Sequence, residues 1–455
     1  MRRFVRELRA VVGPDGVLDE PGALVAFAAD SKVRGMAPVA VALPTTTVQV
    51  QDIVRLCGRE RTPIIPRGAG TGTVGGAVPE CPALVLDLSR MNRILRIDEN
   101  ELLADAQPGV VTGEFQAAVE KVGLFYPPDP ASAATSTLGG NAATGAGGLR
   151  AVKYGVTADW IASLEVVVAD GQTIRTGTRT RKGVVGYDLT RLFIGSEGTL
   201  GVITELTLRL IPKPKAKATL LALFDELSQA GAATVAVLRS NITPAAMELM
   251  DQTALAAVQD HIGDLLPPNV CVLLIEVDGD ADEVAKQANG IRELLQGVNA
   301  REVRVANNAQ ETQRLWSARR AISPALYEMR AQKFSEDVTV PISRIVDLIV
   351  GATKIAQQHK LVHASYGHAG DGNMHVNFLY DADNPDETRR ADTAREELFR
   401  LTLSLGGTIS GEHGVGVAKR PFIAWEQGPA LLDLQRRLKR AFDPLNIFNP
   451  GKIFP

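Results

Sequence analysis

Three segments rich in glycine and other small residues constrain most strongly what this chain can fold into. They read Pro66-Arg-Gly-Ala-Gly-Thr-Gly72, Thr137-Leu-Gly-Gly-Asn-Ala-Ala-Thr-Gly-Ala-Gly-Gly148 and Gly195-Ser-Glu-Gly-Thr-Leu-Gly201. Such segments hold too few large side chains to pack a core, and long loops of this kind inside a domain usually line a site. Glycine also lets backbone N–H groups converge on an anion such as a pyrophosphate. The first segment fits neither the Walker nor the Rossmann fingerprint. Because three such segments lie close together in the first half of the chain, we expect a large phosphate-bearing cofactor wrapped by backbone, with three unrelated turns as the alternative.

Length and composition limit the class of protein. A chain of 455 residues is too long for one ordinary core and predicts at least two domains. With 45% hydrophobic and 22% charged residues, it is expected to be globular rather than disordered. The net charge of −3, without a basic stripe, argues against nucleic acid as a partner. The three cysteines form no CxxC pair, so neither a disulfide framework nor an iron–sulfur cluster is expected.

The N-terminal residues and the hydropathy pattern predict a cytoplasmic enzyme. No apolar run follows the first basic residues, so no secretory signal is expected, and no stretch approaches the roughly 20 apolar residues that span a bilayer. Phe4, Val5, Leu8 and Val12 would share one side of a short amphipathic helix. We expect this helix to pack on the protein surface, with peripheral contact at the inner face of the membrane as the alternative.

Periodicity and turn signals predict two α+β parts. The stiff segment Ile211-Pro-Lys-Pro-Lys215 cannot continue a strand or a helix and is taken as the boundary. The second part is expected to hold one antiparallel sheet with helices on one face. The expected strands are 39–43, 84–88, 161–169, 201–211, 270–277 and 361–366. One helix is expected to follow Thr47 and run to about 60, another to follow Thr112 and run to about 122, and four more at 225–239, 280–295, 308–330 and 342–359.

Two motifs gather three of the six histidines: Gly367-His-Ala-Gly-Asp-Gly-Asn-Met-His375 and Ser410-Gly-Glu-His-Gly-Val-Gly416. His368 and His375, on either side of a glycine turn, can converge on one ion, and Glu412 adds a carboxylate. Two imidazoles and one carboxylate, with positions left open, predict a divalent metal, either zinc, manganese or iron. His413 would point elsewhere and could act as a general base near neutral pH. The alternative is a pair of polar loops whose side chains are satisfied within the protein.

The glycine segments resemble the FAD-binding domain of the vanillyl-alcohol oxidase and p-cresol methylhydroxylase superfamily. The two histidine motifs, with Asn449-Pro-Gly-Lys452, resemble the D-2-hydroxy acid dehydrogenase branch of that superfamily. This branch contains D-lactate dehydrogenases, D-2-hydroxyglutarate dehydrogenases and the catalytic flavin subunit of glycolate oxidase. The resemblance runs from about 38 to 452. It implies an α+β protein with an FAD-binding domain of the p-cresol methylhydroxylase type at 1–213, a substrate or cap domain at 214–420, and a C-terminal helix and tail at 421–455 that return to the first domain.

The resemblance also implies which residues bind FAD. Some relatives attach the flavin covalently to a histidine in the first loop, but Ala69 and Thr71 occupy that stretch here, and no histidine precedes His261. Noncovalent FAD is therefore implied. The phosphates would be held by Arg67, Gly68, Ala69, Gly70, Thr71 and Gly72, the flavin and ribityl chain by Pro130, Ser132, Leu138, Gly139, Asn141, Ala143 and Gly145, the adenine side by Gly198, Gly201 and Ile203, and Asn449 would reach back to the flavin.

The same resemblance implies the roles of the catalytic residues. His368, His375 and Glu412 would be metal ligands, His413 the base, and Asn377 a substrate contact. Arg319, on a predicted helix, would bind the substrate carboxylate with Ser323 one turn on; the alternative for Arg319 is a solvated helix face. Lys333 falls near the second cation of hydroxyglutarate-oxidising relatives, although the spacing from Arg319 is one residue shorter than expected there.

The expected activity is the oxidation of a small D-2-hydroxy acid, such as glycolate or D-lactate, to the 2-oxo acid. Electrons would pass to an acceptor other than oxygen: a quinone, an electron-transfer flavoprotein or an iron–sulfur subunit. A homodimer or a hetero-complex is expected. The alternatives are a D-2-hydroxyglutarate dehydrogenase, a flavin-binding assembly subunit of a glycolate oxidase complex, and an oxidase of aromatic substrates. The two histidine motifs argue against the last two, because neither needs all four side chains.

Overall fold

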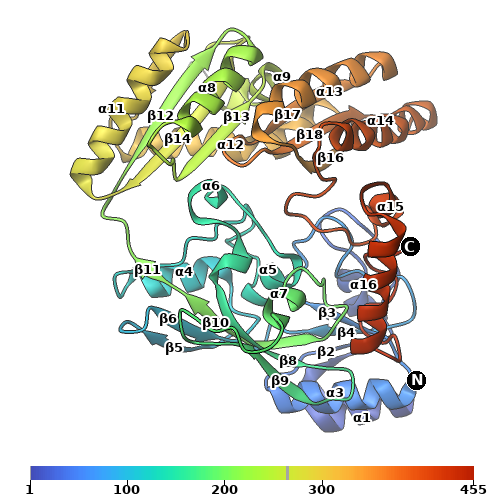
Figure 1. Cartoon of the computed structure of the whole chain (residues 1–455). Coiled ribbons are helices and arrows are strands. Elements are labelled where there is room, and N and C mark those ends of the chain that lie inside the picture. Colours follow the sequence, from blue (N-terminus) through green and yellow to red (C-terminus); the bar gives the residue numbers. More distant parts are fainter. Residues whose placement is uncertain (1, 263–265) are drawn as a thin grey trace. The chain divides into compact units, whose positions relative to one another are not determined.

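The computed structural model describes residues 2–262 and 266–455 and divides the chain into two compact units (Figure 1). Unit 1 consists of residues 1–147, 156–213 and 412–455, and unit 2 of residues 148–155 and 214–411. The chain therefore passes from unit 1 to unit 2 at the Pro-Lys-Pro segment and returns after Gly411, whereas the sequence placed the second boundary at 420. The short excursion at 148–155 has no counterpart in the sequence analysis.

One layer of unit 1 is a four-stranded sheet of order β1-β2-β4-β3, in which β4 runs parallel to both β2 and β3. Its strands are short and fully apolar at their centres, which suits a sheet covered on both faces. The N-terminal helix packs on α3 through Phe4, Val5 and Leu8, as its spacing predicts. The bounds are β1 Val17–Leu18, β2 Ala40–Ala42, β3 Ile64–Arg67, β4 Leu84–Asp87, α1 Arg2–Val12, α2 Pro21–Leu24 and α3 Thr47–Glu60.

The second layer of unit 1 is a five-stranded antiparallel sheet of order β5-β6-β10-β8-β9. Alternating buried residues of β8 and β10 form a core with α4, α5 and α7. A two-stranded pair, β7 with β11, lies at the end of this part. The bounds are β5 Ile94–Asp98, β6 Leu103–Ala106, β7 Leu124–Phe125, β8 Ile161–Val167, β9 Thr173–Gly177, β10 Val202–Arg209, β11 Ile211–Pro212, α4 Thr112–Glu120, α5 Leu138–Thr144 and α7 Leu189–Phe193.

The C-terminal segment of unit 1 is fastened to the four-stranded sheet. Phe448 forms a parallel bridge with Ile64 and is fully buried in the core under that sheet. Asp443 accepts hydrogen bonds from the amides of Ile447 and Phe448 and so holds the turn after the last helix. The helices of this segment are α15 Ile423–Glu426 and α16 Pro429–Phe442.

Unit 2 is built on a seven-stranded sheet of order β15-β12-β14-β13-β17-β18-β16, with every neighbouring pair antiparallel. The strands are β12 Ala216–Phe224, β13 Ala246–Met250, β14 Cys271–Gly279, β15 Glu302–Val305, β16 Gln332–Thr339, β17 Val362–His368 and β18 Asn373–Tyr380. The helices are α6 Ala151–Tyr154, α8 Leu227–Arg239, α9 Gln252–Ala257, α10 Gln259–Ile262, α11 Ala281–Gly297, α12 Ala309–Met329, α13 Ile345–His359 and α14 Pro385–Ser404.

The helices of unit 2 cover both faces of this sheet, so the expectation of helices on one face was wrong. Residues 219–224 of β12 are all buried, which requires apolar cover on each side. Leu221 and Leu223 pack with Leu315 and Trp316 of α12 on one face. The layer on the other face consists of α11, α8, α13 and α14, in which each helix contacts the next in this order. The sequence pattern identified the long helices but could not assign them to a side.

No helix in the described ranges is both long and apolar enough to cross a bilayer.

Candidate active site

A cavity in unit 1 is lined by all three glycine-rich segments. The residues around 130–132 add to its wall, and so do Glu412 and His413. Thr73, Glu197 and Thr137 also line it and were not among the predicted cofactor residues. The predicted cofactor residues that line the cavity are Arg67, Gly68, Ala69, Gly70, Thr71, Gly72, Pro130, Ser132, Gly139, Asn141, Ala143, Gly198, Gly201 and Ile203.

Three predicted cofactor residues lie outside this lining. Leu138 is buried in the core of the five-stranded sheet. Gly145 ends α5 in the left-handed conformation at φ +67°, which favours glycine. The side-chain amide of Asn449 donates to the carbonyl oxygens of Gly76 and Glu197, at 2.7 and 2.6 Å. These three positions therefore support the walls of the cavity rather than form its surface.

The first two glycine segments lie in close contact, which explains why small residues are needed there. A Cβ atom at Gly68 would lie 2.4 Å from Oγ1 of Thr137, so no side chain fits there. Thr137 in turn caps α5, because its hydroxyl accepts a hydrogen bond from the amide of Gly140. Gly70 has φ +70°, and its Cβ would lie 2.1 Å from Nη2 of Arg67. The loop is thus closed around the Arg67 side chain.

The donor set of the cavity suits an extended anionic cofactor. The Oγ1 atom of Thr73 is buried and has no hydrogen-bond partner among the residues that the structure describes. Arg67 is 8% exposed and donates to the carbonyl of Ala77, and burial lowers the pKa of its guanidinium. A buried cation and an unsatisfied hydroxyl in a wall of small residues fit the phosphates and ribityl hydroxyls of FAD. The lining contains one histidine, His413, which lies outside the first loop.

Glu197 fixes the loop that carries Glu412 and His413. Its carboxylate accepts hydrogen bonds from the amides of Val415 and Gly416, at 2.7 and 2.9 Å. Burial raises the pKa of Glu197, against the opposing effect of these two amides. The same residue belongs to the third glycine segment, so one buried side chain joins that segment to the second histidine motif.

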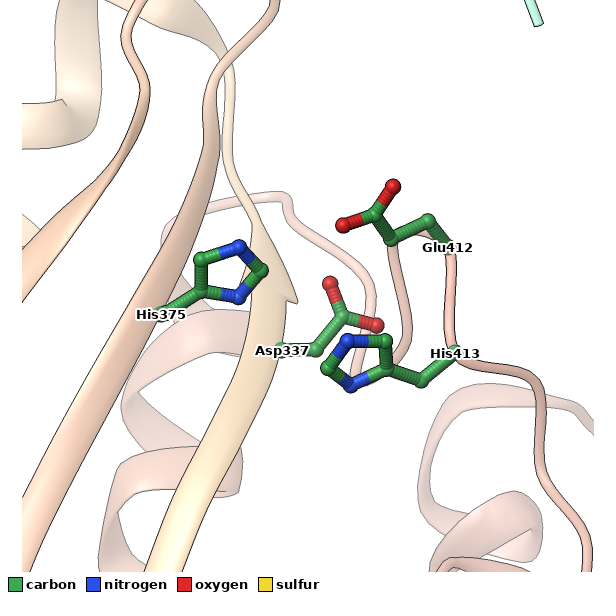
Figure 2. A group of neighbouring side chains, drawn as sticks. All are labelled: Asp337, His375, Glu412 and His413. Carbon is green, nitrogen blue, oxygen red and sulfur yellow. The ribbon is translucent and has the colours of Figure 1, made fainter. Parts of the chain in front are cut away.

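Asp337, His375, Glu412 and His413 form a group of potential metal ligands (Figure 2). One ligand atom from each residue lies within 4.8 Å of the others, and Figure 2 shows the four side chains turned toward a common point. Asp337 is buried and the other three are partly buried. Two imidazoles and two carboxylates are a donor set that suits zinc, manganese or iron. The predicted ligands His375 and Glu412 belong to this group, whereas His368 does not. His413 belongs to it as well, so the expectation that His413 points elsewhere was wrong.

Asp337 explains how the group is assembled. It lies opposite His375 in the pairing of β16 with β18. Its Oδ1 accepts from the side-chain amide of Asn373, at 2.6 Å, and its Oδ2 accepts from the amide of Gly411, at 3.0 Å. Asp337 therefore links the first histidine motif to the residue that precedes Glu412. The sequence analysis missed it, although an acidic residue inside a β-rich run is a usable signal.

His368 and Arg319 meet on a second buried carboxylate, Glu248 of β13. Oε1 of Glu248 lies 2.6 Å from Nδ1 of His368, and Nε of Arg319 donates to Oε2 at 2.7 Å. Burial alone would raise the pKa of Glu248, but the charges of Arg319 and His368 hold it below its ordinary value. The rings of His368 and His375 lie 5.3 Å apart, centre to centre. Arg319 is buried, so the alternative of a solvated helix face does not apply.

The remaining predicted substrate residues are also buried or engaged. The ammonium group of Lys333 donates to the carbonyl and hydroxyl of Ser323, at 2.8 and 3.0 Å, so these two are brought together. The side-chain amide of Asn377 donates to the carbonyls of Ala364 and His375. Its Oδ1 is buried without a partner in the described part of the chain, so β18 carries a free acceptor two residues after His375.

His363 lies on the other side of its strand from this site. Its Nε2 is 2.7 Å from Oγ of Ser365, and burial lowers its pKa to about 4. Asp251 accepts from the amide of Ser365, and burial raises its pKa to about 7. A neutral, enclosed imidazole makes His363 a poor alternative to His413 as a base at neutral pH.

Comparison with known proteins gives the family. The sequence profile described as FAD linked oxidases, C-terminal domain, matches residues 213–453, and the one described as FAD binding domain matches residues 38–177. The chain belongs to the FAD-linked oxidases. The predicted superfamily and the α+β two-domain fold are confirmed, and this FAD-linked oxidase is an oxidoreductase with an FAD-binding domain.

Several curated relatives match the FAD-linked oxidase over nearly its whole length. The glycolate oxidase subunit GlcD of Bacillus subtilis is 42% identical over 98% of this chain and 96% of that protein. The D-lactate dehydrogenase of Anaerostipes hadrus is 34% identical over 90% of this chain and 88% of that protein. The D-2-hydroxyglutarate dehydrogenase of Stutzerimonas stutzeri is 34% identical, over 99% and 98%.

Solved structures match the fold of the FAD-linked oxidase. A p-cresol methylhydroxylase with substrate bound aligns with a TM-score of 0.82 and 23% identity, over 99% of this chain and 96% of that one. An alkyldihydroxyacetonephosphate synthase aligns with a TM-score of 0.79 and 22% identity, over 99% and 86%. At this level of identity the likeness concerns the fold.

Proposed function

We propose that this FAD-linked oxidase oxidises a small D-2-hydroxy acid, such as glycolate or D-lactate, to the 2-oxo acid. The proposal rests on one observation about Glu412 and His413. Both line the FAD-type cavity, and both belong to the group of potential metal ligands. A hydroxy acid at that point would have its hydroxyl near a base and its C2 hydrogen near the cofactor. The relatives named for glycolate, D-lactate and D-2-hydroxyglutarate support the same substrate class.

Each side chain has a separate task in this proposal. His375 and Glu412, from the group of potential metal ligands, hold the divalent metal, with His368 as a further ligand from outside that group. Asp337 fixes Gly411, which precedes Glu412, and Asn373, at the start of the strand that carries His375. His413 accepts the hydroxyl proton, as an imidazole can near neutral pH. Arg319 binds the substrate carboxylate, while Ser323, Lys333 and Asn377 complete the substrate pocket. When bound, FAD supplies the two-electron acceptor and the metal supplies a Lewis acid for the oxidation.

FAD is proposed to be held without a covalent bond, because the first loop contains no histidine. The reduced cofactor would be reoxidised by a quinone, an electron-transfer flavoprotein or an iron–sulfur subunit. The name of the Bacillus subtilis relative, a glycolate oxidase subunit, supports membership of a complex rather than a role as a homodimer. A purely structural flavin subunit is less well supported, because it would not need the four-residue metal-ligand group.

The test is anaerobic reduction of the bound flavin, followed by its absorbance. The purified protein is mixed with glycolate, D-lactate, L-lactate and D-2-hydroxyglutarate, each with and without prior chelation of metal. We expect bleaching by glycolate or D-lactate, none by L-lactate, and a loss of bleaching after chelation. Failure of every 2-hydroxy acid to bleach the flavin would exclude the proposed activity, and selective bleaching by D-2-hydroxyglutarate would move the substrate to a dicarboxylic acid bound through Lys333.

A further inference from the structure

Glu248 is a carboxylate that contacts both a predicted metal ligand, His368, and the predicted substrate anchor, Arg319. It lies on β13 and is fully buried, and the strand pairing of β13 with β17 places it opposite His368. Its two oxygens are divided between partners: Oε1 lies 2.6 Å from Nδ1 of His368, and Oε2 accepts from Nε of Arg319 at 2.7 Å. Nη2 of Arg319 lies 2.5 Å from the same Oε2.

The contact with His368 determines which ring nitrogen carries the proton. A carboxylate can only accept hydrogen bonds, so Nδ1 of His368 must carry a proton. In the neutral form of the ring, which is the form that binds a metal, Nε2 is then the nitrogen with the lone pair. Histidines that bind metals usually have this arrangement, with the second nitrogen donating to a carboxylate or carbonyl. The geometry thus prepares His368 to bind through Nε2.

The contact with Arg319 determines which edge of the guanidinium is left for a ligand. Nε and Nη2 face Glu248, and the planar group lies over the ring of Tyr366, 4.6 Å from its centre. In the described part of the chain, Nη1 has no hydrogen-bond partner. The contacts with Glu248 and Tyr366 therefore hold the plane of the guanidinium. They leave Nη1, with its two N–H donors, to bind the carboxylate of the substrate.

We propose that Glu248 is a positioning residue that orients Arg319 and His368 together, so that the substrate carboxylate and the divalent metal are bound at a fixed spacing. This inference rests on the proposed function for the roles of Arg319 and His368. Glu248 touches neither substrate nor cofactor in this account. Substitution of Glu248 alone should weaken the binding of both the substrate and the divalent metal. The rate at which His413 removes the proton should not change.

The variant test uses the full-length, FAD-loaded protein. Glu248→Gln keeps the size of the side chain but removes its charge. The matched control is Glu276→Gln on the neighbouring strand, a buried carboxylate that pairs with Thr219 and Lys217 instead. Competition with a chromogenic chelator measures the affinity for Zn²⁺, and steady-state kinetics with D-lactate or glycolate separates KM from kcat.

For Glu248→Gln we expect Zn²⁺ affinity to fall by roughly 10–100-fold, the usual effect of losing a ligand's hydrogen-bond partner. KM should rise by about tenfold or more, the cost of one misplaced charge-assisted hydrogen bond. The kcat at saturating Zn²⁺ and substrate should stay near that of wild type, and Glu276→Gln should change neither binding constant. A wild-type Zn²⁺ affinity together with a wild-type KM in Glu248→Gln would overturn the proposal. Equal changes of Zn²⁺ affinity and KM in Glu276→Gln would overturn it as well.

A second measurement is made on the wild-type protein, with one variant used only for assignment, and it does not depend on the substrate. In metal-free wild-type protein labelled with ¹⁵N-histidine, the signal of His368 should show a proton on Nδ1 and none on Nε2. His368→Gln assigns the signal by its disappearance. A proton on Nε2 with none on Nδ1 would contradict the positioning role even if the enzyme oxidises hydroxy acids. Conversely, a correct tautomer with a flavin that no hydroxy acid bleaches would leave Glu248 as a positioning residue and exclude the activity.

Discussion

Arg319 and Glu248 form a buried ion pair, with Nε of the arginine 2.7 Å from Oε2 of the glutamate. Arg319 lies on α12 and Glu248 on β13, so the pair joins a helix to the centre of the seven-stranded sheet. A charge this deeply buried is tolerated only with a partner. The arginine is therefore held in one orientation before any substrate arrives.

The first prediction concerns Arg319→Lys. A lysine is a single point charge that cannot pair with Glu248 and present a planar edge to a carboxylate at once. The loss of charge-assisted hydrogen bonds of about 2–3 kcal/mol should raise KM for the hydroxy acid by roughly 30- to 150-fold. The control is Arg320→Lys, on the exposed side of the same helix, where kinetics should not change. Equal KM values for wild type and Arg319→Lys would place the carboxylate anchor elsewhere.

The second prediction concerns the first glycine loop. In Gly70→Val, a β-branched side chain would have to adopt φ +70° and would meet the Arg67 guanidinium. Most of the variant should therefore purify without FAD, measured by the ratio of flavin to protein absorbance and by acid release of the flavin. Gly123→Val is the matched control, because Gly123 has φ +77° with nothing within 4 Å of a Cβ. A yellow Gly70→Val protein with full FAD content would contradict this role of the loop.

The third prediction concerns two buried groups in unit 2, His363 and Asp251, which affect the pH dependence of stability in opposite directions. The pKa of His363 falls from 6.5 to about 4, so below pH 6.5 the unfolded chain binds a proton that the folded chain does not. This contribution makes stability rise with pH. The pKa of Asp251 rises from 3.8 to about 7, so the folded chain keeps a proton that the unfolded chain has lost, and stability falls with pH. Between about pH 4 and 6.5 the two contributions oppose each other.

His363→Gln should expose the contribution of Asp251. Relative to wild type, its free energy of unfolding should decrease by about 1.4 kcal/mol per pH unit across this window. Asp251→Asn should show the opposite slope. Urea unfolding can be followed by the fluorescence of Trp316, in a background where Trp160 and Trp425 are phenylalanine, so that unit 2 alone is observed. Parallel pH profiles for both variants and wild type would mean that these groups do not titrate as described.

The sequence predicted the parts of the site that local chemistry specifies. The glycine segments and the two histidine motifs are contiguous, so their composition identifies Gly68, Gly70, His375 and Glu412 directly. Glu248 and Asp337 were missed because their importance comes from strand pairing with His368 and His375, far away in the chain. The same limit applies to the sheet of unit 2: periodicity located α8 and α12, but only the pairing order shows that they cover opposite faces.

The fourth prediction concerns the metal ligands. His375→Ala should lower bound metal and flavin reduction together, because His375 contributes one of the clustered ligand atoms. Addition of excess Zn²⁺ or Mn²⁺ should restore part of the rate. His359→Ala is the control, since that histidine ends α13 and pairs with Glu397. Metal content measured by mass spectrometry that stays at the wild-type value in His375→Ala would show that the ion is held by other residues.

The central claim is that His413 removes the hydroxyl proton beside the FAD cavity, and single-turnover flavin reduction of His413→Ala tests it most directly. The variant is first shown to carry wild-type amounts of FAD and metal and is then mixed anaerobically with substrate in a stopped-flow instrument. We predict reduction slower by roughly 10²–10⁴-fold, the usual effect of losing a general base. Reduction at the wild-type rate would contradict the claim, and loss of the metal from the variant would make His413 a ligand instead.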